Sequence, residues 1–218
     1  MLKMICRWAI FLLLMGNNTF VFASDAVEQL KIFSKSAKSS SGDFVQQQVT
    51  INSDGKPRVL KELSGHFLFS RPGKFVWEVE KPYQQKMVAD GKQLAMWDKD
   101  LNQVTYRPAT QVLAATPAAI LFGDTAVDVY FDITLVGQKG ELTWLELTPK
   151  VNKSGATDIP YSKIGIGMMD NLPQAMELRD NFGNVVLLTL SHLKTNIAIS
   201  SSEFIFKPPP GTDIVKLP

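Results

Sequence analysis

The chain has 218 residues, of which 45% are hydrophobic and 20% are charged, and its formal net charge is +2. Lys3 and Arg7 account for this positive excess, so residues 24–218 carry 21 basic and 21 acidic side chains and are formally neutral. A neutral chain of this length can bury the core of one domain, and it lacks both the basic footprint of a nucleic-acid-binding protein and a polybasic membrane patch.

The N-terminus has the layout of a secretory signal peptide. Lys3 and Arg7 precede an apolar run at residues 8–15, and residues 21–23 form the short region expected before a cleavage site. The run is too short for a transmembrane anchor, which needs roughly 20 apolar residues. We therefore predict cleavage after Ala23 and a single domain over residues 24–218.

The only cysteine of the chain, Cys6, lies within this leader. Residues 24–218 therefore contain no thiol that could be acylated, act as a nucleophile or form a disulfide, although the compartment of an exported protein permits disulfides. Packing has to supply the stability of the domain.

One amphipathic helix precedes a long series of strands. Asp25 and Glu28 have the spacing of a capping box, and Leu30 and Phe33 follow, so a helix is predicted over residues 24–38. After a polar break at residues 39–42, turn signals recur between segments with strand-like patterns. The predicted strands include residues 44–51, 60–70, 129–136, 142–147, 161–168, 174–179, 185–190 and 203–206, with a hairpin turn at residues 90–91.

A second helix is predicted between residues 107 and 124. Thr116 and Pro117 form a good N-cap and first-turn pair, and Ile120 and Leu121 suit a helix that packs against a sheet. With two helices and about eleven or twelve antiparallel strands, the chain is expected to be mainly β, as a barrel or a sandwich.

The segment from Gly65 to Val104 carries one strongly apolar face. Phe75, Trp77 and Val79 alternate with side chains that point the other way. This face is either the core of an ordinary sandwich or the inner wall of a concave sheet that accepts acyl chains, and flexible methionines suit a wall that repacks around variable chains. The candidate wall residues are Phe67, Phe69, Phe75, Trp77, Val79, Met87, Leu94 and Met96.

The sequence contains no recognisable catalytic or metal-binding arrangement. His66 and His192 lie in separate predicted strands without ligand spacing, and His192 continues the face of Leu188 and Leu190. Residues 165–167 (GIG) lack the third glycine of a nucleotide-binding loop. We therefore expect no enzyme activity, no cofactor and no metal.

Four segments of the chain form a recognisable combination: RPGKFVWEVEKPYQQKMVADGKQLAMWDKDLNQV, TPAAIL, the strand FVQQ and the terminal FIFKPPPGTDIV. Together, and in their order along the chain, they resemble the LolA family of periplasmic outer-membrane lipoprotein carriers. The resemblance implies an unclosed antiparallel β-barrel of about eleven strands, with helices that form a lid over an apolar cavity. The lid residues would be Leu30, Phe33, Ile120 and Leu121.

The resemblance also implies a role and partners. A LolA-like protein takes acylated lipoproteins from an inner-membrane lipoprotein-releasing ABC transporter, carries their acyl chains through the periplasm as a monomer, and passes them to an outer-membrane receptor. Arg71 matches the arginine of the RP motif that bonds to the lid helix and latches the empty cavity.

Two other functions fit parts of the sequence. The acylated receptor of the same fold needs a cysteine after its signal peptide, which this chain lacks. A LolA-like periplasmic protein that binds or senses another apolar ligand is the alternative that the sequence leaves open.

Overall fold

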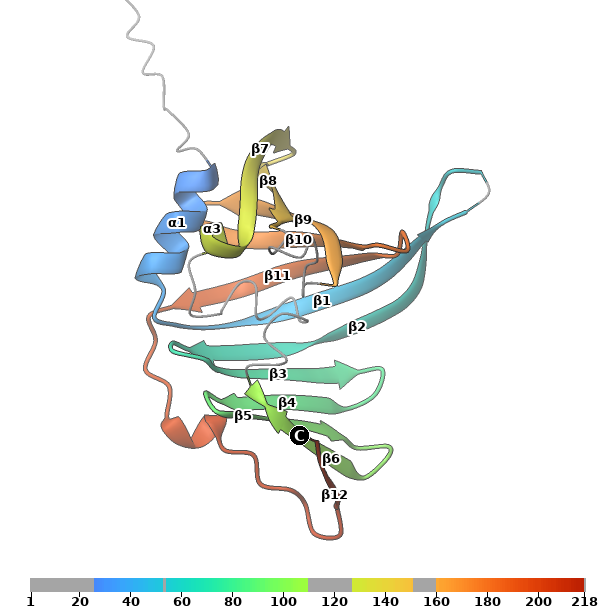
Figure 1. Cartoon of the computed structure of the whole chain (residues 1–218), viewed down its shortest axis with the longest axis vertical. Coiled ribbons are helices and arrows are strands. Elements are labelled where there is room, and N and C mark those ends of the chain that lie inside the picture. Colours follow the sequence, from blue (N-terminus) through green and yellow to red (C-terminus); the bar gives the residue numbers. More distant parts are fainter. Residues whose placement is uncertain (1–25, 53, 110–126, 151–159, 218) are drawn as a thin grey trace, which may run out of the picture.

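Twelve strands form one open sheet (Figure 1). The structure is a computed structural model that describes residues 26–52, 54–109, 127–150 and 160–217. The order of strands across the sheet is β12-β6-β5-β4-β3-β2-β1-β11-β10-β9-β8-β7. The strands are β1 (Ser39–Ile51), β2 (Pro57–Ser70), β3 (Lys74–Lys81), β4 (Gln85–Asp90), β5 (Gln93–Asp98), β6 (Gln103–Pro108), β7 (Phe131–Lys139), β8 (Leu142–Pro149), β9 (Tyr161–Met169), β10 (Leu172–Asp180), β11 (Val185–Thr195) and β12 (Asp213–Lys216).

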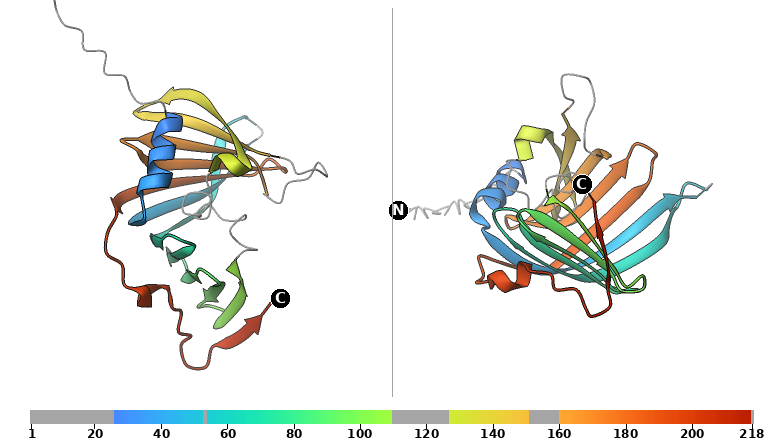
Figure 2. Two further views of the ribbon diagram at one scale, coloured as in Figure 1. Left: turned by 60° about the vertical axis from the view of Figure 1, so that its left-hand side comes forward. Right: turned by 60° about the horizontal axis from the view of Figure 1, so that its bottom comes forward.

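The sheet consists of two antiparallel meanders that meet at its centre. The first runs from β1 to β6 and the second from β7 to β11, and β11 pairs with β1 over most of its length. The last strand, β12, adds to β6 in parallel. Because β7 and β12 are the two edges and are not paired with each other, the sheet stays unclosed, and it curls around its concave face (Figure 2).

The hydrophobic core lies on the concave face. Helix α1 (Ala26–Ser36) packs against β7, β8, β9 and β10 and buries Ala26, Leu30 and Phe33. A short helix α3 (Val127–Tyr130) leads into β7. Each large side chain buried in this way contributes about 1.5–3 kcal/mol to the stability of the fold. Packing against the sheet therefore stabilises α1 more than its helix propensity does. Among the described residues, no helix is long and apolar enough to span a bilayer.

A smaller apolar cluster lies on the outer face of the first meander. Val76 and Val88 point away from the main core and pack against Phe204 of the C-terminal segment. The short 3₁₀ helix η2 (Ser201–Phe204) presents this phenylalanine, and the Ser200 hydroxyl caps it by accepting from the N–H of Ser202. The segment that covers the outer face thus continues into β12.

The expectation of a mainly β protein with one unclosed sheet of about eleven or twelve strands is confirmed, since the described residues form twelve. Strand β1 begins at Ser39, where a polar break was predicted, because small residues fit against β2: a side chain at Gly42 would meet the ring of Phe67 at 2.8 Å. The predicted strand at residues 203–206 is wrong, since η2 occupies this position, and β12 was not predicted. The second predicted helix falls largely on residues 110–126, outside the described residues.

Candidate functional site

The eight candidate wall residues lie on one face of the sheet. Six of them belong to the main buried cluster, and the methionines at positions 87 and 96 are partly buried and pack against it. The strand pairs explain this, because Phe67 lies opposite Trp77, and Trp77 opposite Met87. Since cross-strand partners point to the same side of a sheet, one correct register places the whole set together.

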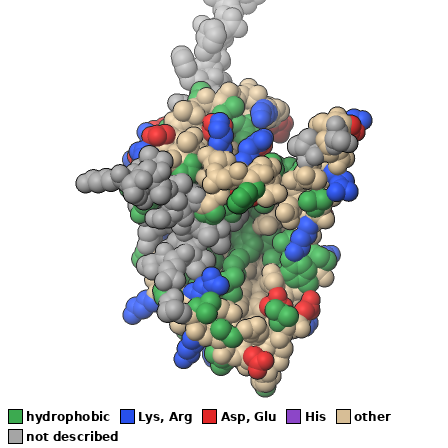
Figure 3. Space-filling model, turned by 45° about the vertical axis from the view of Figure 1, so that its right-hand side comes forward, with side chains coloured by type: hydrophobic (Ala, Val, Ile, Leu, Met, Phe, Trp, Pro, Cys, Tyr) green, Lys and Arg blue, Asp and Glu red, His purple; other side chains and the backbone are tan. Residues whose placement is uncertain are grey.

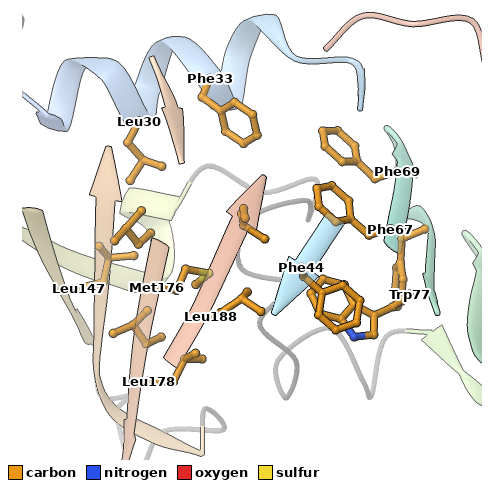
Figure 4. Packing of buried hydrophobic residues seen from close by; sticks show 14 of the residues in the cluster. Leu30, Phe33, Phe44, Phe67, Phe69, Trp77, Leu147, Met176, Leu178 and Leu188 are labelled. Carbon is orange, nitrogen blue, oxygen red and sulfur yellow. The ribbon is translucent and has the colours of Figure 1, made fainter. Parts of the chain in front are cut away.

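The concave face has two halves. On the half that the first meander forms, aromatic rings make a continuous layer (Figure 4). Phe44 stacks on Trp77 with ring centroids 3.8 Å apart, and Phe67 stacks on the same indole at 5.9 Å. Phe33 of α1 meets Phe69 edge to face at 6.4 Å, so the helix joins the layer. Aromatic pairs of this kind add about 0.5–1.5 kcal/mol per pair beyond the buried area.

Aliphatic side chains and methionines form the other half of the concave face. They come from the second meander and face the aromatic layer beneath α1 (Figure 4). From sequence, the methionines at positions 168 and 176 were expected to suit such a wall, but Phe44 and the leucines and isoleucines of this half were not predicted, although period-2 alternation in residues 161–168 and 185–190 indicates them. These residues are Leu145, Leu147, Ile164, Ile166, Met168, Met176, Leu178, Leu188 and Leu190.

The concave face offers apolar contacts almost exclusively. The buried polar or charged side chains of the described residues are Gln29, Ser39 and Ser40, none of which is charged. Partial burial raises the pKa of the Tyr161 hydroxyl, and the nearby Asp180 raises it further, so this tyrosine at the margin of the core stays neutral. On the side shown in Figure 3, hydrophobic side chains line a hollow, with charged side chains to its right and below it.

Helix α1 bridges this face, and its predicted lid residues Leu30 and Phe33 are buried against it. At the end of the helix, Arg71 Nε donates a hydrogen bond to the Ala37 carbonyl at 2.9 Å, and its guanidinium lies 5.3 Å from the ring centroid of Phe69. A cation is favourable at a helix C-terminus, where carbonyl groups lack helical partners. Residues Ile120 and Leu121, the other lid candidates, lie outside the described residues.

Comparison with known proteins identifies the family. The sequence profile of the family described as "Outer membrane lipoprotein carrier protein LolA" matches residues 35–207. The chain belongs to the LolA family.

The relatives cover nearly the whole chain. The outer-membrane lipoprotein carrier protein of Ralstonia nicotianae is 44% identical over 88% of this chain and 87% of its own length. That of Bordetella avium is 37% identical over 98% of both chains. Among solved structures, an uncharacterized conserved protein from Thermus thermophilus has the same fold, with a TM-score of 0.58, 15% identity and coverage of 88% of this chain and 99% of that one.

The histidines of this LolA-family chain lie on the outer face. His66 has Nδ1 3.2 Å from Glu80 Oε1 and Nε2 3.5 Å from Glu78 Oε2. His192 lies 2.8 Å from Asp43 and is largely exposed, so the prediction that it continues the inward face of Leu188 and Leu190 is wrong. Its φ of 52° and the shift in register between β1 and β11 at residues 41–43 turn it outward. Among the described residues, no group of three or more acidic, histidine or cysteine side chains could hold a metal ion.

Proposed function

We propose that this chain is a periplasmic carrier that binds the acyl chains of lipoproteins and delivers them from the inner to the outer membrane. The observation that carries the proposal is the apolar concave face, with its aromatic half, its aliphatic half and α1 across them. The names of the LolA-family relatives, outer-membrane lipoprotein carrier protein, support the choice of cargo.

The energetics of acyl chains explain the need for such a surface. Each methylene that leaves water gains roughly 0.8 kcal/mol, so ten methylenes gain on the order of 8 kcal/mol. A lipoprotein exposed to the aqueous periplasm would lose this stabilisation. The carrier replaces the membrane by offering carbon surface, and the methionines at positions 87, 96, 168 and 176 can adjust to chains of different shape.

The chain itself has no need for catalysis. We propose an inner-membrane lipoprotein-releasing ABC transporter as donor, which supplies the energy of extraction, and an acylated outer-membrane receptor as acceptor. The carrier acts as a monomer, is not an enzyme and needs no cofactor. Residues 1–23 direct export as a cleaved signal peptide, and residues 24–218 form the single carrier domain.

A lid allows both capture and release. We propose that α1, with Leu30 and Phe33 on its inner side, closes over the cavity when no cargo is bound, together with the segment that contains Ile120 and Leu121. The bond from Arg71 to the Ala37 carbonyl favours this closed state. A carrier that gains stability on closing holds its cargo less tightly, which favours onward transfer.

The carrier function can be tested by incubating purified residues 24–218 with energised spheroplasts that synthesise labelled lipoproteins. Lipoproteins in the soluble fraction, in a one-to-one complex with the protein, are the expected result. A matched preparation with an established LolA serves as the positive control. If that control releases lipoproteins and this protein does not, the carrier function is wrong and the alternative of a periplasmic protein that binds or senses another apolar ligand takes its place.

A further inference from the structure

The C-terminal end of α1 is bonded to the sheet on both sides. Arg71 N donates to the Lys38 carbonyl at 2.8 Å, which ties the chain after α1 to the end of β2. On the other side, Lys38 N donates to Asn196 Oδ1 at 2.9 Å, and Asn196 N donates to the Ser39 carbonyl at 2.7 Å. Since Ser39 is already the first residue of β1, this end cannot leave the sheet without breaking strand contacts.

The first half of α1 contacts the sheet in a different way. Gln29 is a polar side chain on the buried side of the helix, only 6% exposed, and its Oε1 accepts a hydrogen bond from Asn171 N at 3.1 Å. Asn171 and Asp170 form the tight turn between β9 and β10, with φ values of 60° and 52°. The N–H that Gln29 bonds therefore belongs to a turn and not to a strand pair.

Burial of a side-chain amide such as that of Gln29 costs free energy unless the amide is hydrogen-bonded, whereas burial of a leucine at position 29 would be favourable. The bond between Gln29 and Asn171 joins the helix to a turn, so it can break and reform while every strand pair of the sheet stays intact. When this bond breaks, water can solvate both groups, so the bond itself adds only modestly to the cost of opening, beside the buried contacts of Leu30 and Phe33.

We infer that α1 opens by swinging its N-terminal half away from the β9–β10 turn, about a pivot at residues 38–39, and that Gln29 and Asn171 form the catch that holds it closed. The swing tilts the Ala37 carbonyl away from the Arg71 guanidinium, so the bond between these two groups also favours the closed helix. Gln29 is thus a positioning residue of the lid, at the end opposite to Arg71. Cargo enters over the half of the concave face that α1 covers, beside β7 to β10. This inference rests on the proposed carrier function only for the identity of the cargo.

The first test measures the swing without cargo, in residues 24–218, which contain no native cysteine. Leu30→Cys and Ala37→Cys place one thiol at either end of the helix, at positions that are 3% and 1% exposed. We expect maleimide to label the thiol at position 30 at least tenfold faster than the thiol at position 37. Adding Gln29→Met should speed labelling at position 30 about fivefold, the factor that one neutral hydrogen bond contributes, and leave position 37 unchanged. Equal labelling of both positions, or equal acceleration at both, would overturn the pivot.

The second test locks each end reversibly. A short bis-methanethiosulfonate reagent bridges Gln29→Cys to Asn171→Cys in one variant and Lys38→Cys to Asn196→Cys in the other, and reductant removes each bridge. The probe is a fluorescent synthetic triacylated lipopeptide, and bound probe is separated by gel filtration. We expect the bridge at the catch to reduce binding at least tenfold, with recovery after reduction, and the bridge at the pivot to leave binding unchanged.

The outcomes separate the two proposals. Undiminished binding with the catch bridged, or an equal loss with the pivot bridged, overturns the swing. If even the unmodified protein binds no lipopeptide, the carrier function is wrong, and the labelling rates still decide the swing on their own. The reduced form of each variant, which differs from the bridged form only in the cross-link, controls for folding.

Discussion

Phe44 of β1 stacks on Trp77 of β3, although β2 lies between these two strands. The contact is possible because Gly65 is the residue of β2 opposite Phe44, and a glycine leaves the space above the strand empty. The two rings lie 3.8 Å apart at their centroids and only 19° from parallel. This pair therefore closes the aromatic half of the concave face into one continuous surface.

The stack predicts which of two adjacent residues matters for binding. Phe44 is 1% exposed and faces the interior, while Val45 is 39% exposed and faces outward. We expect Phe44→Glu to abolish lipoprotein release from spheroplasts, because it places a charge among apolar groups, and Val45→Glu to retain it. Thermal melts should show that Phe44→Glu keeps enough structure for the assay. Equal release by both variants would mean that the concave face does not receive the cargo.

The glycine beneath the stack makes a separate prediction about stability. A Cβ at Gly65 would collide with the backbone carbonyl of Glu78, which belongs to the paired strand and cannot turn aside as a side chain can. Gly65→Ala should therefore unfold at a temperature lower by roughly 10 °C, as expected for a loss of about 3 kcal/mol in a chain of this size. Ser64→Ala, one residue earlier, is the control and should change little. Calorimetry distinguishes the two, and an unchanged melt for Gly65→Ala would show that β2 and β3 can separate at low cost.

The aromatic half of the site could be predicted from sequence because alternation fixes the faces of short strands. Phe75, Trp77 and Val79 occupy every second position of β3, and turn residues on both sides leave little freedom of register. The role of Phe44 could not be predicted in this way. Its contact with Trp77 crosses an intervening strand and depends on Gly65, which is a property of three strands together.

Most of the wrong predictions fall on elements without a periodic pattern. The segment around Phe204 has the composition of a strand, but the capping by Ser200 and the burial of a single ring on the outer face favour a 3₁₀ turn. Strand β12 has only four residues and pairs in parallel with β6, a contact about 110 residues away along the chain that no local signal indicates. At His192, the positive φ interrupts the alternation that the preceding residues establish.

The outer cluster predicts how the C-terminal segment is held. Phe204 is 2% exposed between Val76 and Val88, whereas its neighbour Ile205 is 60% exposed. Phe204→Ala should destabilise the protein by about 3 kcal/mol, and Ile205→Ala by much less, because only the first leaves a cavity. Amide hydrogen exchange should show faster exchange in residues 213–216 of Phe204→Ala. If exchange there is unchanged, β12 holds the segment without help from this ring.

Substitution of Arg71 tests whether its bond to the end of α1 stabilises the proposed closed state of the empty carrier. Its guanidinium bonds to the carbonyl at the end of α1, and a hydrogen bond from a charged donor contributes roughly 1.5–3 kcal/mol, so Arg71→Leu should shift the equilibrium away from the closed state by about tenfold or more. We expect this variant to release lipoproteins from spheroplasts as the wild type does, because capture needs only the apolar face. Transfer of the bound lipoprotein to outer-membrane vesicles should be slower by about tenfold, since a carrier that gains less on closing gives up its cargo less readily. Lys74→Leu, which removes a positive charge three residues further along the chain, is the control and should transfer normally. Equal transfer rates for Arg71→Leu and the wild type would show that the bond to Ala37 only positions the helix end and does not promote release.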